Sequence, residues 1–505
     1  MKILYLLLTF SLLFWGCKHE NEFIEPPNIV LILIDDMGWK DVGYAGSVFY
    51  DTPNIDQLAT EGMHFTNAYS PAAVCAPSRG GIFSGKFPAR TKFTTVFNGA
   101  AGPDDRLYER SKYRGDNDQY FEARHRHVLP SDEVILAQAM AEGGYKTGFF
   151  GKWHIGETPG YYPDDRGFHV AKGYRRVHGL KYGHFGNAWP EGNLANLPDP
   201  DSTEFIPETL TREAINFMKE NSQEPYLAVL SHYIVHTPIT PLKEKVSKYE
   251  NSKKTDQVNP KYAALVESVD ESVQQVLQAI KELGQEENTL VIFTSDNGGY
   301  TAPSITSNYP LMGGKSFPFE AGTKVPFIIK WPQKIKPGIS SERIVGTDIY
   351  PTILAAAGLD LRPEQHVDGI NLMPLVMEKK PLPNRPIVFH YPHYTHATGP
   401  FSSIIEDNWK LIRFYNDEKG AYLLYNLAKD PEEQNNLAES EPAKKEFLSN
   451  RLQDLLKEMK AEMPEKNPNF SNSSTRRLYN LEFTLNLAER ERRMFEKRLE
   501  LSNQE

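Results

Sequence analysis

Two groups of oxygen-bearing side chains follow apolar segments of the chain. Asp35 and Asp36 come directly after one β-branched run, and Asp296 and Asn297 follow a second run after a single serine. Three carboxylates and one amide oxygen are hard ligands, which favour calcium or magnesium over zinc. An acidic pair after a strand also commonly caps a helix, so these four residues alone leave both interpretations open.

A cysteine opens a segment that favours a helical turn, Cys75-Ala76-Pro77-Ser78-Arg79. Pro77 suits a first helical turn because it lacks the amide donor that such a turn leaves unused. The free amides of its neighbours favour an anion such as sulfate or phosphate. Arg79 lies four residues after Cys75, about one helical turn, so we expect both side chains to face the same way.

Lysines and histidines lie near the ends of other apolar segments. Lys152 and His154 are two residues apart at a predicted strand end, a spacing that lets both point to one side. His236 follows another predicted strand, and Lys315 lies in Gly-Gly-Lys-Ser-Phe. A single lysine is usually solvated and a single histidine is often structural, which is how we interpret His232.

These residues require elements that bring them together. Four apolar runs predict buried strands: Ile29–Ile34, Tyr145–Phe150, Tyr226–Leu230 and Thr289–Thr294. Ligands bind outside the carboxyl ends of the strands in open α/β sheets, so these four ends are expected to converge on one site. Helical patterns such as Lys261–Leu283 supply the crossovers. The predicted fold class is α/β, a large doubly wound mixed-sheet domain flanked by helices, with a smaller C-terminal α+β subdomain.

The N-terminus has the pattern of an export signal. Met1-Lys2 precedes an apolar run from Ile3 to Trp15, which is too short for a typical spanning helix. Gly16-Cys17 after this run resembles a bacterial lipoprotein signal, in which Cys17 is lipidated and attaches the protein to a membrane; plain secretion is the alternative. We therefore expect an exported protein of the periplasm, outer membrane or cell surface.

Composition limits the classes of function. A chain of 505 residues, 40% hydrophobic and 11% aromatic, can bury a large core and form one big domain with a smaller one. The formal charge of -10 argues against a general nucleic-acid binder. The only two cysteines are Cys17 and Cys75, so lipidation of one and modification of the other would leave none for a disulfide.

The spacing C-x-P-S-R resembles the signature of the type I sulfatases of the alkaline phosphatase superfamily. The surrounding stretch from Thr52 to Ser70 and later motifs are also similar to that family, and the likeness extends from Asn28 to Ala438. The resemblance implies that a maturation enzyme oxidises Cys75 to formylglycine. It also implies a calcium ion bound by Asp35, Asp36, Asp296, Asn297 and the modified Cys75.

The same resemblance implies roles for the other residues. Arg79 would hold the formylglycine hydrate, Lys152 and Lys315 would contact sulfate, His154 would assist elimination, His236 would lie near the leaving oxygen, and Asp296 would also act as a base. One segment departs from the family pattern Glu-Gly-Gly-x-Arg-x-Pro, because Glu320–Pro326 reads Glu-Ala-Gly-Thr-Lys-Val-Pro. This change bears on the shape of the loop. It affects none of the residues proposed to bind the metal or the sulfate.

The resemblance also divides the chain. Residues 1–17 are the predicted signal peptide, 18–27 a tether, 28–382 the catalytic sulfatase domain, 383–470 the C-terminal subdomain and 471–505 a charged helical extension. We interpret this extension as a solvated surface helix.

Aromatic and cationic residues in two long loops, Phe97–Pro130 and Glu157–Pro207, and in the segment His390–His396 suit a polyanionic sugar. The alternative is that these loops pack their own aromatic residues. The predicted function is removal of sulfate from sulfated poly- or oligosaccharides. A phosphonate or phosphate diester hydrolase of the same superfamily, or an inactive glycan-binding surface lipoprotein, are the alternatives.

Overall fold

The computed structural model describes residues 25–96, 104–108, 118–176, 183–189, 192–253, 255–301, 305–416, 421–470 and 481–502. The predicted signal peptide, Cys17 and most of the tether lie outside the described residues. Among the described residues, no helix has the length and apolar character needed to cross a membrane.

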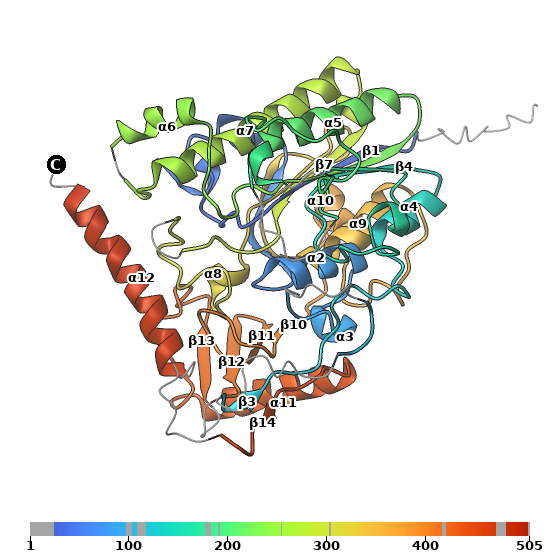
Figure 1. Cartoon of the computed structure of the whole chain (residues 1–505). Coiled ribbons are helices and arrows are strands. Elements are labelled where there is room, and N and C mark those ends of the chain that lie inside the picture. The colour runs from blue at the N-terminus through green and yellow to red at the C-terminus, as the bar shows by residue number, and fades with distance from the viewer. Residues whose placement is uncertain are drawn as a thin grey trace, which may run out of the picture.

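An eight-stranded mixed sheet forms the centre of the larger part of the molecule (Figure 1). Most neighbouring strands are parallel, but β8 runs antiparallel to both β7 and β2. In spatial order the strands are β5 (Val170–Lys172), β4 (Lys146–Gly151), β6 (Tyr226–Ser231), β1 (Asn28–Ile34), β7 (Thr289–Ser295), β8 (Phe327–Lys330), β2 (Met63–Tyr69) and β9 (Gly338–Val345).

Helices cover both faces of this sheet. One face packs against α2 (Cys75–Ser84), α4 (Leu136–Glu142), α9 (Ile349–Ala356) and α10 (Met373–Glu378). The other face packs against α1 (Pro53–Glu61), α5 (Ile206–Glu220) and α7 (Pro260–Glu282). Three short helices complete this part: α3 (Pro88–Thr91), α6 (Lys243–Glu250) and α8 (Glu320–Thr323).

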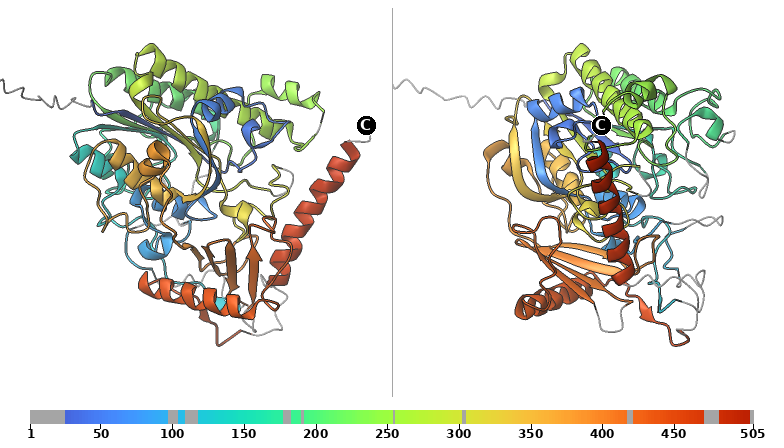
Figure 2. Two further views of the ribbon diagram at one scale, coloured as in Figure 1. Left: turned by 180° about the vertical axis from the view of Figure 1, so that it is seen from behind. Right: turned by 90° about the vertical axis from the view of Figure 1, so that its left-hand side faces the viewer.

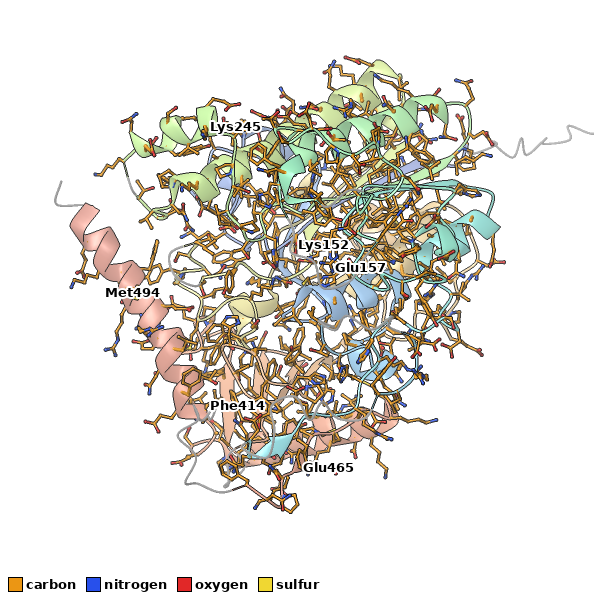
Figure 3. The ribbon with its side chains drawn as sticks, viewed as in Figure 1. Lys152, Glu157, Lys245, Phe414, Glu465 and Met494 are labelled. Atoms are coloured by element: carbon orange, nitrogen blue, oxygen red, sulfur yellow. The ribbon has the colours of Figure 1, made fainter. Side chains whose placement is uncertain are left out.

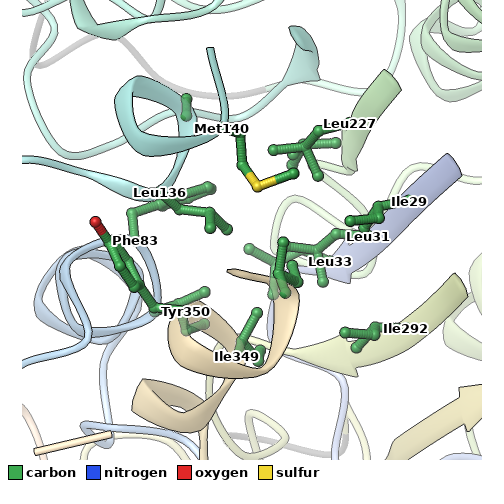
Figure 4. Packing of buried hydrophobic residues seen from close by; sticks show 14 of the residues in the cluster. Ile29, Leu31, Leu33, Phe83, Leu136, Met140, Leu227, Ile292, Ile349 and Tyr350 are labelled. Carbon is green, nitrogen blue, oxygen red and sulfur yellow. The ribbon is translucent and has the colours of Figure 1, made fainter. Parts of the chain in front are cut away.

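Strand β1 shows why the sequence reads as an uninterrupted apolar run. Ile29, Leu31 and Leu33 belong to one core cluster, and the residues between them belong to the other (Figure 4). Since successive side chains point to opposite faces, a central strand covered on both faces needs apolar residues at every position. The predicted fold class is confirmed, including the smaller second part described next.

The smaller part contains a four-stranded antiparallel sheet, seen below the main sheet in Figure 2. Its strands are β10 (Ile387–Tyr391), β11 (Phe401–Glu406), β12 (Trp409–Phe414) and β13 (Tyr422–Asn426), with α11 (Pro442–Glu458) packed against them. A third core cluster joins this sheet to Tyr69, Val74 and Phe319 of the larger part. Two short strands, β3 (Tyr120–Phe121) and β14 (Glu465–Lys466), pair with each other, and α12 (Leu481–Ser502) ends the described chain.

Candidate active site

The carboxyl ends of four neighbouring parallel strands, β4, β6, β1 and β7, meet at one edge of the main sheet. The register places Ile34 beside Ser295, so the residues that follow, Asp35 and Asp296, become neighbours. The amide of Asp296 donates to the Ile34 carbonyl over 3.0 Å. Lys152 follows β4, and its amide donates to the carbonyl of the last residue of β6. The predicted convergence of these strand ends is therefore confirmed.

Cys75 is the first residue of α2 and faces this edge. One ligand atom from each of Asp35, Cys75 and Asp296 lies within 4.8 Å of the others, and all three residues are buried. This cluster unites positions from three distant parts of the chain. It has the composition of a metal site beside a potential nucleophile.

Two glycines let α2 pack this closely. A Cβ at Gly80 would lie 2.8 Å from the ring of Phe93, and a Cβ at Gly81 would lie 2.6 Å from Pro71. Glycine in a helix costs about 1 kcal/mol relative to alanine. Close packing on both sides of the helix explains why glycine is present at both positions.

Asp36 and Asn297 extend the cluster. The amide group of Asn297 donates to Asp36 Oδ1 over 2.8 Å, and the Asp36 backbone N–H donates to Asp296 Oδ1 over 3.2 Å. Successive side chains of an extended chain point in opposite directions. The left-handed backbone of Asp36, with φ of 64°, breaks this alternation, so both acidic residues after β1 reach the same edge.

Three cations compensate the carboxylates. Arg79 Nε lies 2.6 Å from Asp296 Oδ2, Lys152 Nζ lies 2.5 Å from Asp35 Oδ2, and Lys315 Nζ lies 2.7 Å from Asp36 Oδ2. Figure 3 marks Lys152 in the interior, near α2. Arg79, as expected, faces the same site as Cys75, four residues before it. Both Arg79 and Lys152 are fully buried, so these charges have fixed positions.

Two oxygen atoms of this cluster have no hydrogen-bond partner among the described residues. They are Asp35 Oδ1 and Asn297 Oδ1, and both are buried. A buried acceptor without a partner costs about 1–3 kcal/mol. Hard oxygen atoms held in this way beside two other carboxylates fit a calcium or magnesium ion, so the residues present suit the metal that the resemblance implies.

The site shifts the acidities of its groups in different directions. Burial raises the pKa of Asp35 to about 8, although Lys152 opposes this shift. Burial also acts on Asp36, but the positive charge of Lys315 outweighs it and holds the pKa of Asp36 below its usual value. Burial raises the pKa of the Cys75 thiol, with Lys152 and Lys315 acting against it. An unmodified thiol here is protonated and a poor nucleophile, which favours a modified residue as the reactive group.

The histidines differ in their surroundings. His236 Nδ1 donates to the Thr237 carbonyl over 2.6 Å, and its Nε2 lies 3.7 Å from Asp36 Oδ2. Burial and Lys315 hold the pKa of His236 well below its usual value, so the ring is neutral at pH 7. His232 instead bonds Ser272 Oγ over 2.8 Å within the core, in agreement with a structural role. His154 is buried two residues after Lys152.

The reason given above for pairing Lys152 with His154 was wrong. Strand β4 ends at Gly151, so strand alternation does not apply to these two residues. The backbone at His154 is left-handed, with φ of 64°. The direction of the His154 side chain is therefore set by the irregular backbone that follows the strand.

Several arginines of the two long loops make contacts within the protein. Arg175 forms a buried ion pair with Glu157, and the guanidinium of Arg166 donates to three backbone carbonyl groups, among them that of Leu129. Arg124 pairs with Glu462 over 2.9 Å. Much of Phe97–Pro130 lies outside the described residues. For these arginines, packing within the protein is the correct interpretation.

The segment that departs from the family pattern packs directly behind the site. The amide of Gly298 donates to the carbonyl of Gly322, and a Cβ at Gly298 would lie 1.8 Å from the carbonyl oxygen of Ala321. Lys324 donates to Asn67 Oδ1 over 3.2 Å and lies over the ring of Trp39. The substitution of lysine for arginine thus changes contacts away from the carboxylate cluster.

One residue that positions Arg79 could not be recognised from the sequence. Ser231 ends β6, accepts a hydrogen bond from Arg79 Nη1 over 2.6 Å and donates to the Lys152 carbonyl over 2.7 Å. A serine at the end of an apolar run resembles an ordinary strand terminus. Its contact with a helix residue depends entirely on the tertiary structure.

A mixed sheet with a carboxylate cluster and a buried cysteine at its carboxyl edge agrees with the arrangement that the resemblance to the alkaline phosphatase superfamily implies. A family model described as Sulfatase matches residues 27–359, and one described as N-sulphoglucosamine sulphohydrolase, C-terminal, matches residues 312–462. The chain belongs to the sulfatase family, as a type I sulfatase, and is a sulfuric ester hydrolase.

Known relatives share most of the chain. N-acetylgalactosamine-6-sulfatase of Mus musculus is 30% identical over 395 residues, which cover 72% of this chain and 69% of the relative. Arylsulfatase A of Homo sapiens is 30% identical over 459 residues, with coverage of 82% and 83%. The crystal structure of Ps i-CgsB in complex with k-i-k-neocarrahexaose has a TM-score of 0.73 at 26% identity, and the match covers 93% of this chain and 98% of that one.

Proposed function

We propose that this sulfatase removes sulfate from sulfated poly- or oligosaccharides, with Cys75 oxidised to formylglycine and a bound calcium ion. One observation carries the proposal: a buried cysteine lies within 4.8 Å of two carboxylates, beside three cations. The residues that would hold the metal are Asp35, Asp36, Asp296, Asn297 and the modified Cys75.

Charge supports a divalent metal. With all three carboxyl groups ionised, as ligands of a metal would be, they balance the three cations of the described site. A divalent cation would leave an excess of positive charge, and a sulfate ester carries one negative charge. The metal-loaded site would therefore attract the anionic group on which it acts.

The nucleophile and the metal supply the central chemistry. The hydrated aldehyde of formylglycine offers one hydroxyl to attack sulfur and a second whose deprotonation expels sulfate, while calcium would act as a Lewis acid. Arg79 is held by Asp296 and Ser231, so it can hold the hydrate in a fixed orientation. Lys152 and Lys315 stabilise the negative charge on the sulfuryl oxygens.

The leaving group is expected on the side of Asp36. Lys315 and His236 both approach Asp36 Oδ2, at 2.7 and 3.7 Å. One of these two groups stabilises or protonates the departing alcohol. His154, buried near Lys152, is proposed to take up the proton in the elimination step.

The proposed substrate class draws on the relatives. The name of N-acetylgalactosamine-6-sulfatase refers to a carbohydrate, and Ps i-CgsB was solved in complex with k-i-k-neocarrahexaose. The proposal extends that substrate class to this chain. We also propose export with a lipid anchor at Cys17, on the basis of the N-terminal sequence alone.

The test is the release of free sulfate from a panel of sulfated glycans and oligosaccharides. The protein is co-expressed with a formylglycine-generating enzyme, assayed with calcium, and compared with Cys75→Ala. We expect release from one glycan, reduced by more than about 1000-fold in the variant. Removal of calcium with a chelator should also abolish release.

Phosphate and phosphonate esters form a second arm of this test. Turnover of a phosphonate or phosphate diester above that of every sulfate ester would overturn the proposal in favour of that hydrolase class. No turnover of any ester, with formylglycine verified at position 75 by mass spectrometry, would favour an inactive glycan-binding protein.

A further inference from the structure

A cavity of about 460 Å³ lies between helix α12 and the segment that contains Asn308 and Tyr309. Its volume is in the range of about 300–1000 Å³ that is common for small-molecule sites. His396, Arg490 and Phe495 contribute further parts of its wall. The cavity is therefore large enough for part of a saccharide chain.

The cavity adjoins the candidate active site. His396, in its wall, lies close enough to Lys315 and Asp36 that both charges act on it, in addition to the burial that lowers its pKa. The ring of Tyr300 meets the His396 ring edge-on, with 5.4 Å between their centroids. The charges of Lys315 and Asp36 act on both rings, and His396 also lines the cavity.

The cavity wall and a proposed sulfate-binding lysine form one hydrogen-bonded unit. The Asn308 side chain donates to the carbonyl groups of Gly299 and Gly313, over 3.1 and 3.2 Å. The same Gly299 carbonyl accepts a hydrogen bond from the Lys315 backbone over 3.0 Å. The position of a substrate bound in the cavity would therefore be fixed relative to the position of Lys315.

Helix α12 supplies the outer wall and lies beyond both family models, which end at residues 359 and 462. It runs along the side of the molecule from the small sheet (Figures 1 and 2). Glu491 accepts a hydrogen bond from Thr301, and the Phe495 ring lies 5.9 Å from that of Tyr309. Ala488 is part of the core. The expectation of a simple solvated helix was thus wrong for the inner face of α12.

The lining combines polar, aromatic and cationic groups. Tyr309 provides an aromatic ring, whereas the side-chain amides of Gln257 and Asn308 already donate to backbone carbonyl groups. Arg492 is held by Glu489 and Glu496. Arg490 is exposed and forms no ion pair with the described residues, so its guanidinium is the lining cation suited to an anionic ligand.

We propose that this cavity is a subsite for the sugar on the leaving-group side of the scissile ester, with Arg490 binding a second sulfate group of the same oligosaccharide. This inference rests on the proposed function. Under this proposal, α12 contributes to substrate specificity although it lies beyond the residues that the family models match. Substrates with two sulfate groups on neighbouring sugars should gain most from it.

The experiment compares Arg490→Ala with the unchanged enzyme on a disulfated oligosaccharide, its monosulfated counterpart and a small aryl sulfate. We expect kcat/KM for the disulfated substrate to fall about 10-fold, mainly through KM, because a hydrogen bond to a charged group is lost. The fall should be at least about 5-fold larger than that for the aryl sulfate. Arg490→Lys should recover part of the loss.

Arg493→Ala is the matched control, since its side chain is 74% exposed on the same helix and is absent from the cavity lining. It should leave all three substrates unaffected. Equal losses on all three substrates in Arg490→Ala, or no loss on the disulfated one, would overturn the inference.

A binding measurement separates this inference from the proposed function. In Cys75→Ala protein, calorimetry should show that Arg490→Ala weakens binding of the disulfated oligosaccharide about 10-fold, while Arg493→Ala does not. Absence of sulfate release by the active enzyme would refute the proposed function. Unchanged binding in Arg490→Ala would refute the subsite.

Discussion

Two buried charge clusters in this protein differ in how completely their oxygen atoms are paired. At the contact between the larger part and the small sheet, Lys410 Nζ lies 3.0 Å from Glu320 Oε1 and 2.9 Å from Glu433 Oε1. The second oxygen of Glu320 accepts a hydrogen bond from Tyr69 OH over 2.6 Å. That of Glu433 accepts from the Glu320 backbone, also over 2.6 Å. Three of the four carboxylate oxygens therefore accept a hydrogen bond, and the fourth, Glu433 Oε1, has the Lys410 ammonium 2.9 Å away as an ion pair without hydrogen-bond geometry.

The candidate active site is different. Asp35 Oδ1 and Asn297 Oδ1 are equally buried and have no hydrogen-bond partner among the described residues. A cluster that only joins two parts of a protein gains most from complete pairing. Buried oxygen atoms stay unpaired where a ligand supplies the missing partner. The difference in pairing therefore separates a structural cluster from a binding site.

The largest expected effect is on the structural cluster. Lys410→Met would leave two buried glutamates without their cation, and breaking a buried ion pair in this way costs about 3–5 kcal/mol. The free energy of unfolding, measured by urea denaturation, should fall by that amount. Lys429→Met, at an exposed position of the same part, is the control and should change stability little. Equal effects of both changes would contradict the contrast.

The active-site cluster should respond to loss of a cation in another way. Lys315→Ala should lower kcat/KM for sulfate esters by about 100-fold, since a charge that stabilises the transition state is lost. Calcium should bind as tightly or more tightly, because an ammonium 2.7 Å from Asp36 Oδ2 no longer repels the ion. Titration calorimetry measures the affinity. Calcium binding that weakens as strongly as activity would show that Lys315 supports the metal site.

The smallest expected effect is a pH dependence. Burial raises the pKa of Glu433 to about 7, although Lys410 opposes the shift. Between about pH 5 and about pH 7, Glu433 keeps its proton in the folded protein but loses it in the unfolded chain. The free energy of unfolding therefore falls as pH rises through this interval. Glu433→Gln cannot lose this proton. As pH rises through this interval, the free energy of unfolding of the variant minus that of the wild type should therefore increase by about 1–3 kcal/mol. Glu439→Gln, at an exposed position of the same part, is the control, and an equal gain in stability there would contradict the role assigned to Glu433.

The sequence alone predicted the strands that position the site but missed others. Ile29–Ile34 and Thr289–Thr294 are apolar because both faces are covered, and this pattern is unmistakable. Strands β2 and β9 were not anticipated, since both contain polar residues and partly exposed positions. Strand β11 was also missed. Alternating burial leaves a weaker signal than complete burial.

The candidate site could be predicted where its residues lie in recognisable motifs. Asp35, Asp296 and Cys75 fall into this group. The contacts of Ser231, and the place of His396 between the site and the α12 cavity, could not be predicted. They depend on segments that are distant in the chain, and no local pattern reports such packing.

The burial of Cys75 imposes an order of events on the maturation of this enzyme. Its side chain is 3% exposed, at the buried start of α2 and against the edge formed by β1 and β7. A modifying enzyme cannot reach a thiol in that position. Under the proposed function, the oxidation has to occur before β7, more than two hundred residues further along the chain, pairs with β1 and encloses Cys75. Fast folding would then compete with the oxidation of Cys75. The fraction of active enzyme would be decided before the chain has finished folding.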